Sequence, residues 1–166
     1  MGTPTWSQDV DVAADSPIKG YSNIMYTFHF YAATHGDCYR QKVQAAIQKG
    51  LPVFVSEFGI SESSGNGRID KNEANKWMQF LKKNKISYVC WSLCNKNESC
   101  SLLKSSCSRT GNFKKSDLSQ AGLWYKSVKW QRNGRIWFLK SLWNSHEIFG
   151  LLLKITWISD MVLVTK

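Results

Sequence analysis

Three short apolar runs along the chain predict β-strands. They cover residues 24–31, 52–58 and 86–93, are rich in β-branched and aromatic side chains, and the second run ends at Gly59. Apolar side chains occupy nearly every position of each run, on both of its faces. We therefore expect strands buried on both sides, as in a parallel sheet covered by helices.

Two helices are predicted between these runs and a third after them. Residues 37–49 and 70–84 carry apolar residues at helical spacing, Gly50 ends the first segment, and Asp70 with Glu73 resembles an N-terminal capping pair. The third helix is expected to begin after Ser116. Alternating strands and helices predict an α/β fold with right-handed parallel crossovers. The expected apolar stripes are Tyr39, Val43, Ala46 and Ile47, then Ala74, Trp77, Met78 and Leu81, then Leu118, Ala121, Tyr125 and Val128.

The pattern weakens after Lys129, where Lys, Arg, Trp and long apolar residues mix without a clear period. We therefore divide the chain into a patterned domain, residues 1–128, and a basic, apolar tail, residues 129–166. The apolar stretch from Ile148 to Ile158 is interrupted by Gly150 and Lys154 and is too short to span a bilayer.

The net charge of +10 is unevenly distributed. Residues 102–166 hold eleven Lys or Arg against three Asp or Glu, so most of the excess lies outside the patterned strands and helices. No Gly-rich phosphate loop or RNA-binding motif accompanies it. Neither a nucleic acid nor a membrane is expected as a partner, although a basic tail keeps both as minor alternatives.

Five cysteines, an odd number, leave at least one thiol unpaired within the chain. The spacing of Cys94, Cys100 and Cys107 is not that of a standard zinc site, so neither a metal nor another cofactor is predicted. The N-terminal residues have neither the basic start nor the apolar run of a secretory signal peptide.

Polar and aromatic residues occur where the predicted strands end, and that is where parallel α/β barrels place their chemistry. Glu57 closes the second strand, and by itself fits either a functional carboxylate or a strand-end salt bridge. His29 and Tyr31 lie two apart on the first strand and so point to the same side. His29 and Tyr31 fit a buried core equally well when considered alone. Trp91, considered alone, is more often a core residue than a platform for a sugar ring.

Five motifs in order give these residues a common context. They are TPTWSQD at 3–9, MYTFHFYAATHG at 25–36, VFVSEFG at 53–59, SGNG at 64–67 and WSLCNKNES at 91–99. This series resembles glycoside hydrolase family 5, and within it the bacterial endoglucanases. The resemblance covers roughly residues 2–125 and implies the C-terminal part of a (β/α)8 TIM barrel, about strands five or six to eight.

The resemblance also implies an activity, namely hydrolysis of β-1,4-glucan with retention of configuration. By motif, Glu57 corresponds to the nucleophile, while His29 and Tyr31 correspond to the pair that contacts substrate and orients it. Further substrate contacts are implied for Trp6, His35, Trp91, Lys96 and Glu98.

The family's second carboxylate, the acid/base, follows an Asn at the end of strand four and has no counterpart in this chain. Glu62, Glu98, Asp9 and Asp11 do not match its motif. The resemblance implies that the parent enzyme is secreted. Because the acid/base has no counterpart in this chain, two roles are open for it. It either associates with a separate N-terminal half or is a non-catalytic carbohydrate-binding remnant.

Overall fold

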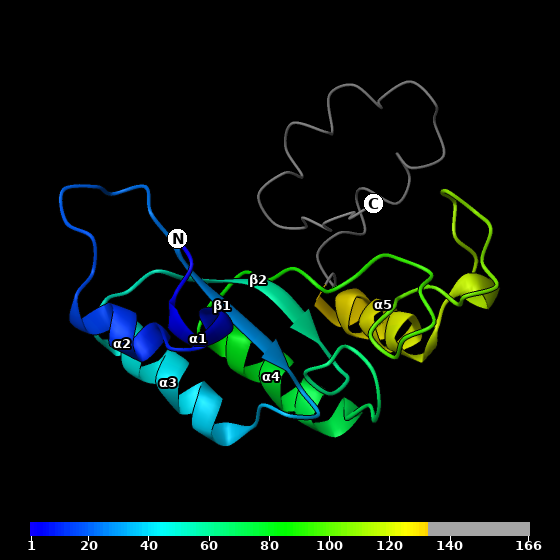
Figure 1. Cartoon of the computed structure of the whole chain (residues 1–166), viewed down its shortest axis with the longest axis horizontal. Helices are drawn as coiled ribbons and strands as arrows, with labels where there is room; N and C mark the ends of the chain where they lie inside the picture. Colours follow the sequence, from blue (N-terminus) through cyan, green and yellow to red (C-terminus); the bar gives the residue numbers. More distant parts are fainter. Residues whose placement is uncertain (133–166) are drawn as a thin grey trace.

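The computed structural model describes residues 1–132, of which 129–132 are described by their backbone alone. Its centre is a pair of parallel strands, β1 (Tyr26–Tyr31) and β2 (Val53–Gly59), connected by helix α3 (Asp37–Gln48). Helix α4 (Lys71–Lys83) follows β2, and α2, α3 and α4 lie along the same side of the strands (Figure 1). The predicted strand–helix alternation is confirmed for these elements.

The prediction of a third regular strand, at residues 86–93, is wrong, although this segment still lies alongside β2. Only one isolated parallel bridge forms, between Val55 and Tyr88. The N–H groups of Val89 and Trp91 donate to the carbonyls of Val55 and Phe58 at 2.8 Å each. Residues 87–91 therefore take the place of a neighbouring strand without building a continuous ladder.

The opposite edge of β1 is occupied by the first residues of the chain. The Met1 amino group donates to the Met25 carbonyl, and the Thr27 N–H donates to the Met1 carbonyl, each at 2.8 Å. This is the hydrogen-bond pattern of a parallel bridge opposite Tyr26. Four segments thus run side by side in chain order, as consecutive units of a parallel sheet do.

The core lies between the strands and helices α3 and α4, and its centre is aromatic. Trp77 of α4 is fully buried and stacks on Phe30 of β1 with ring centroids 4.0 Å apart, and Phe30 stacks on Phe58 of β2 at 5.2 Å. Val43 and Ala46 of α3 are also fully buried. The predicted apolar stripes therefore face the sheet, where large aromatic side chains exclude water most effectively.

Several short elements were not predicted. Helical turn α1 (Pro4–Ser7) and helix α2 (Val10–Asp15) follow the first residues, and a 3-10 turn, η1 (Lys115–Asp117), precedes helix α5 (Gln120–Arg132). Helix α5 confirms the predicted third helix and continues across the proposed boundary at residues 128/129. The rest of the predicted tail, residues 133–166, lies outside the described residues.

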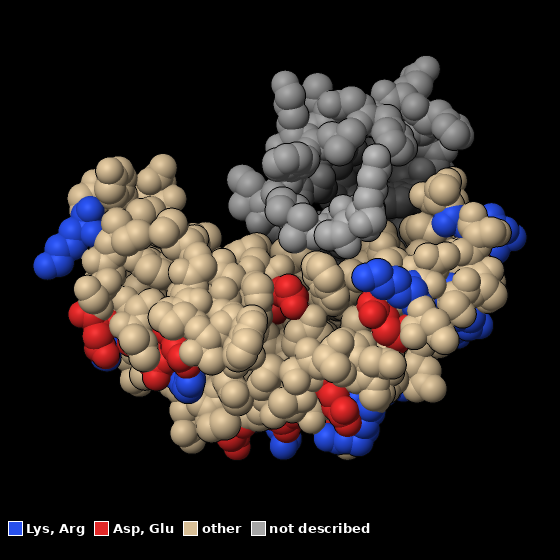
Figure 2. Space-filling view, viewed as in Figure 1, with Lys and Arg blue, Asp and Glu red and all other residues tan. Residues whose placement is uncertain are grey.

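Charged side chains of both signs are interspersed along the side of the molecule where helices α2, α3 and α4 lie, the lower side in Figure 2. Within residues 1–132, no helix is long and apolar enough to cross a membrane.

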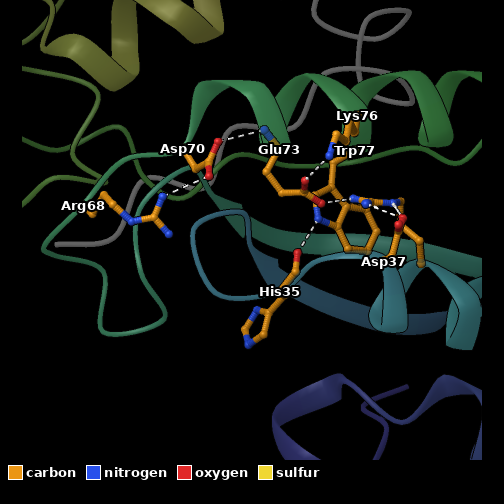
Figure 3. A network of polar contacts seen from close by, with 8 residues as sticks. His35, Asp37, Arg68, Asp70, Glu73, Lys76 and Trp77 are labelled. Atoms are coloured by element: carbon orange, nitrogen blue, oxygen red, sulfur yellow. Dashed lines mark hydrogen bonds and ion pairs between the residues drawn. The ribbon is translucent and has the colours of Figure 1, made fainter.

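Helix α4 is anchored by the polar network of Figure 3. Asp70 caps it by accepting from the Glu73 N–H at 2.9 Å, as predicted. The reciprocal half of the capping box is absent, because the Glu73 carboxylate pairs with Arg40 of α3 at 2.5 Å and with Lys76 at 3.0 Å. Arg40 is buried and also bonds Asp37, so the network ties α3 to α4.

Removing this cap gives a direct test of the helix start. Asp70→Ala is expected to lower the free energy of unfolding by about 1 kcal/mol, because the Glu73 N–H loses its acceptor. Asp70→Asn keeps an acceptor at the same position and should lose clearly less. Urea unfolding followed by circular dichroism measures both. Equal losses for the two variants would show that the Asp70–Arg68 ion pair, 3.0 Å long, matters more than the cap.

Candidate active site

Three side chains from the ends of β1 and β2 meet at one point. The Tyr31 hydroxyl donates to Glu57 Oε1 at 2.7 Å, and His29 Nδ1 lies 3.8 Å from Glu57 Oε2. The side chains of His29 and Glu57 are each 26% exposed, so the carboxylate is held by protein on one side and open to solvent on another. The two strands thus bring together the three residues singled out in the sequence.

A β-bulge in β2 produces this arrangement. Phe28 pairs with Val55, but His29 pairs with Glu57, so Ser56 is the extra residue. Ser56 Oγ lies 2.8 Å from His29 Nε2, and therefore two consecutive residues of β2 face the same imidazole. Without the bulge, strict alternation would direct Glu57 to the other face of the sheet.

Burial shifts the pKa values of His29 and Tyr31, the two residues beside the Glu57 carboxylate. Desolvation lowers the pKa of His29, and the charge of Glu57 offsets only part of this effect. The pKa of Tyr31 is raised far above its ordinary value by burial, by its hydrogen bond to Glu57, and by the negative charges of Glu57 and Glu98. At neutral pH Tyr31 is consequently a firm hydrogen-bond donor to Glu57.

Two residues that the sequence did not single out shape the site. Ser56 bonds His29, as described above. Ser56 and Glu57 are two consecutive polar residues in an otherwise apolar strand, and this is the one feature of the sequence that indicates the bulge. Gly59 leaves room for the Tyr31 ring, because a Cβ there would lie 2.7 Å from two of the ring carbons.

The loop after residue 91 carries the predicted sugar contacts. The Trp91 N–H donates to the carbonyl of Phe58, the residue directly after Glu57. The Trp91 side chain is partly exposed. Lys96 is exposed, and Glu98 is near enough for its charge to act on Tyr31. Cys100 donates to Glu98 Oε1 at 3.5 Å, and burial followed by the charge of Glu98 raises the Cys100 pKa to about 12.

Trp6 and His35 have contrasting environments. Trp6 is 86% exposed in a left-handed turn, and within the described residues its indole has no hydrogen bond and no contact with another ring, so its face is accessible. His35 is only 4% exposed, and its Nδ1 accepts from the Tyr31 N–H at 2.8 Å. The ring of His35 is therefore used within the protein, and a sugar contact of this residue stays a prediction.

Two of the other carboxylates considered in the sequence, Asp9 and Glu62, are engaged elsewhere or face solvent. Asp9 pairs with Lys42 at 2.5 Å, and that hydrogen bond holds the Asp9 pKa below its usual range. Glu62 is exposed in the turn that contains Gly65. Among residues 1–132, no group of three or more His, Cys, Asp or Glu side chains has the arrangement of a metal site.

Known proteins match the part of the chain that carries these site residues. Residues 1–97 match the family model described as cellulase, glycosyl hydrolase family 5. An endoglucanase of Clostridium saccharobutylicum is 50% identical over 126 residues, which are 76% of this chain and 28% of that protein. Endoglucanase A of Butyrivibrio fibrisolvens is 38% identical over 125 residues, 75% of this chain and 29% of that protein. The chain thus spans less than a third of the length of these relatives.

Solved structures agree with this match. The cellulase Cel5C_n has a TM-score of 0.72 at 46% identity, over 76% of this chain and 38% of that one. The catalytic domain of endoglucanase Cel5A from Thermobifida fusca, solved with cellotetraose, has a TM-score of 0.71 at 31% identity, over 77% of this chain and 44% of that one. These neighbours are (β/α)8 barrels, so the prediction of a partial barrel is confirmed.

Proposed function

The chain belongs to glycosyl hydrolase family 5, the cellulases, and on that premise we propose that it supplies the nucleophile half of a retaining endo-β-1,4-glucanase, with Glu57 as the nucleophile. The observation that carries this proposal is the partly exposed Glu57 carboxylate, with one oxygen bonded by Tyr31 and the other beside His29. A strand-end salt bridge, the alternative role, would place Lys or Arg at this carboxylate. The described part of the chain has neither there.

The two oxygens of Glu57 have different roles in this proposal. Oε1 accepts from Tyr31, which fixes the carboxylate plane. Oε2 has no hydrogen-bond donor within the described residues, so its lone pairs are available to form a bond to the anomeric carbon. As that bond forms, the bond from the anomeric carbon to the leaving oxygen breaks, and water later hydrolyses the glycosyl ester.

A second carboxyl group must protonate the leaving oxygen and then activate the water. In retaining glycosidases it lies about 5–5.5 Å from the nucleophile. We assign it to barrel units beyond these residues, carried either by a longer chain or by a separate N-terminal half. Trp6, Trp91, Lys96 and Glu98 are the proposed sugar contacts, and β-1,4-glucan outside the cell is the proposed substrate.

A chimera tests the proposal. The matching 126-residue segment of the Clostridium saccharobutylicum endoglucanase is replaced by this chain's own residues, and release of reducing ends from carboxymethylcellulose is measured. We expect hydrolysis, because the chimera restores the missing carboxylate. A folded chimera that binds cellotetraose in calorimetry but releases no reducing ends would favour the alternative, a non-catalytic carbohydrate-binding remnant.

A further inference from the structure

The position of Tyr31 decides how Glu57 is held. Its hydroxyl is the one hydrogen-bond donor to that carboxylate within the described residues, and its ring lies flat against Gly59. Tyr31 is also the last residue of β1, where the chain leaves the sheet. Whatever fixes the backbone of Tyr31 therefore also fixes the nucleophile proposed above, and the inference below rests on that proposal.

The backbone of Tyr31 faces the outer edge of β1. Ala32 donates to Gly59 of β2, so the neighbouring N–H and C=O of Tyr31 point the opposite way, as do those of Thr27. At Thr27 this outer edge is bonded by Met1 and by the Thr3 hydroxyl. The first segment then turns away at α1, so among residues 1–132 no strand reaches the backbone of Tyr31 on this side.

His35 takes the place of the missing strand. Its Nδ1 accepts from the Tyr31 N–H at 2.8 Å, and its own N–H donates to the Tyr31 carbonyl, also at 2.8 Å. The Tyr31 carbonyl also accepts from the Thr34 N–H at 3.0 Å, so the imidazole of His35 matters for the Tyr31 N–H. Left unpaired in this buried position, that N–H would cost on the order of 1–3 kcal/mol.

His35 is itself fixed by three other elements. Its carbonyl accepts from the Trp77 indole of α4 at 2.7 Å, while the imidazole points away from the charged network (Figure 3). The Gln8 side-chain amide lies 3.2 Å from Nε2, and the Tyr39 ring of α3 packs against the imidazole at 4.5 Å. Its burial lowers the His35 pKa, which keeps Nδ1 free to accept at neutral pH.

We propose that His35 is a positioning residue: its buried imidazole completes the end of β1 and thereby holds the Tyr31 hydroxyl on Glu57. It acts through the Tyr31 backbone and touches neither substrate nor the reacting atoms. This role differs from the sugar contact expected from the sequence, and it explains why a histidine lies four residues after the tyrosine.

Two amide substitutions of different length test the proposal in the full chain. In His35→Asn the side-chain oxygen occupies the position of Nδ1, whereas in His35→Gln it lies one bond further from the backbone. The readout is the Tyr31 hydroxyl proton by NMR at neutral pH, assigned by its absence in Tyr31→Phe. A hydroxyl bonded to a carboxylate gives a slowly exchanging resonance, which depends on local opening.

We expect His35→Asn to keep this resonance and His35→Gln to lose it or to exchange it at least about tenfold faster. A merely structural role would lower the stability of both variants without separating them in this readout. The proposal is overturned if folded His35→Gln retains the wild-type exchange rate, or if His35→Asn loses the resonance as well. Because no substrate is used, the outcome is independent of whether Glu57 proves to be the nucleophile.

Discussion

Glu57→Gln is expected to reduce hydrolysis of carboxymethylcellulose by the chimera by on the order of 10³-fold or more, the scale on which removal of a covalent nucleophile acts. The amide has nearly the same shape and still accepts a hydrogen bond from Tyr31, but its oxygen is too weak a nucleophile to attack the anomeric carbon. Asp15→Asn is the matched control. It makes the same chemical change at an exposed α2 carboxylate that pairs with Lys49.

An activated substrate tests the proposed nucleophile independently of the carboxyl group that would protonate the leaving oxygen. A 2,4-dinitrophenyl 2-deoxy-2-fluoro-cellobioside carries a leaving group that needs no proton, so the attack by Glu57 releases dinitrophenolate and leaves a glycosyl ester on the carboxylate. Mass spectrometry of the digested full chain should find that ester on the peptide containing Glu57, and none in Glu57→Gln. An ester on another carboxylate of the same chain would refute the assignment of the nucleophile.

Gly122→Ala is expected to destabilise the fold by about 3 kcal/mol, the upper end of the usual cost of overpacking. Gly122 lies in the first turn of α5, and a Cβ there would be 2.0 Å from the Leu102 carbonyl oxygen. That carbonyl also accepts from the Ser119 N–H at 3.0 Å, so the helix start cannot retreat without losing a hydrogen bond.

The direction of the stability change distinguishes close packing at Gly122 from helix propensity. In an open helix, replacing Gly by Ala stabilises by up to about 1 kcal/mol, so helix propensity alone predicts the opposite result. Gly111→Ala serves as the control, since a Cβ at residue 111 meets nothing within 4 Å and should change stability by less than about 0.5 kcal/mol. Urea unfolding midpoints measure both. A Gly122→Ala protein as stable as the control would contradict the close packing of α5 on Leu102.

Local patterns in the sequence were sufficient for the main helices and for two strands. The stripes that include Val43 and Trp77 predicted which helix faces are buried, and Asp70 predicted a cap. These features depend on residues within a few positions of one another. The run at residues 86–93 has the same local pattern but forms only one bridge, because a ladder depends on the backbone geometry of its neighbour as well.

The sequence by itself determined that Glu57 and the pair His29 and Tyr31 lie toward the ends of two neighbouring strands. Only the tertiary structure decided how they meet. The bulge at Ser56 turns Glu57 toward His29, and packing buries His35, whose Nδ1 accepts from the Tyr31 N–H, the contact on which its proposed positioning role is based. The Tyr31–His35 hydrogen bond joins residues only four apart, but the bulge and the burial of His35 depend on partners far along the chain, such as Ser56 for His29 and Trp77 for His35. Local spacing of residues carries no record of those distant partners.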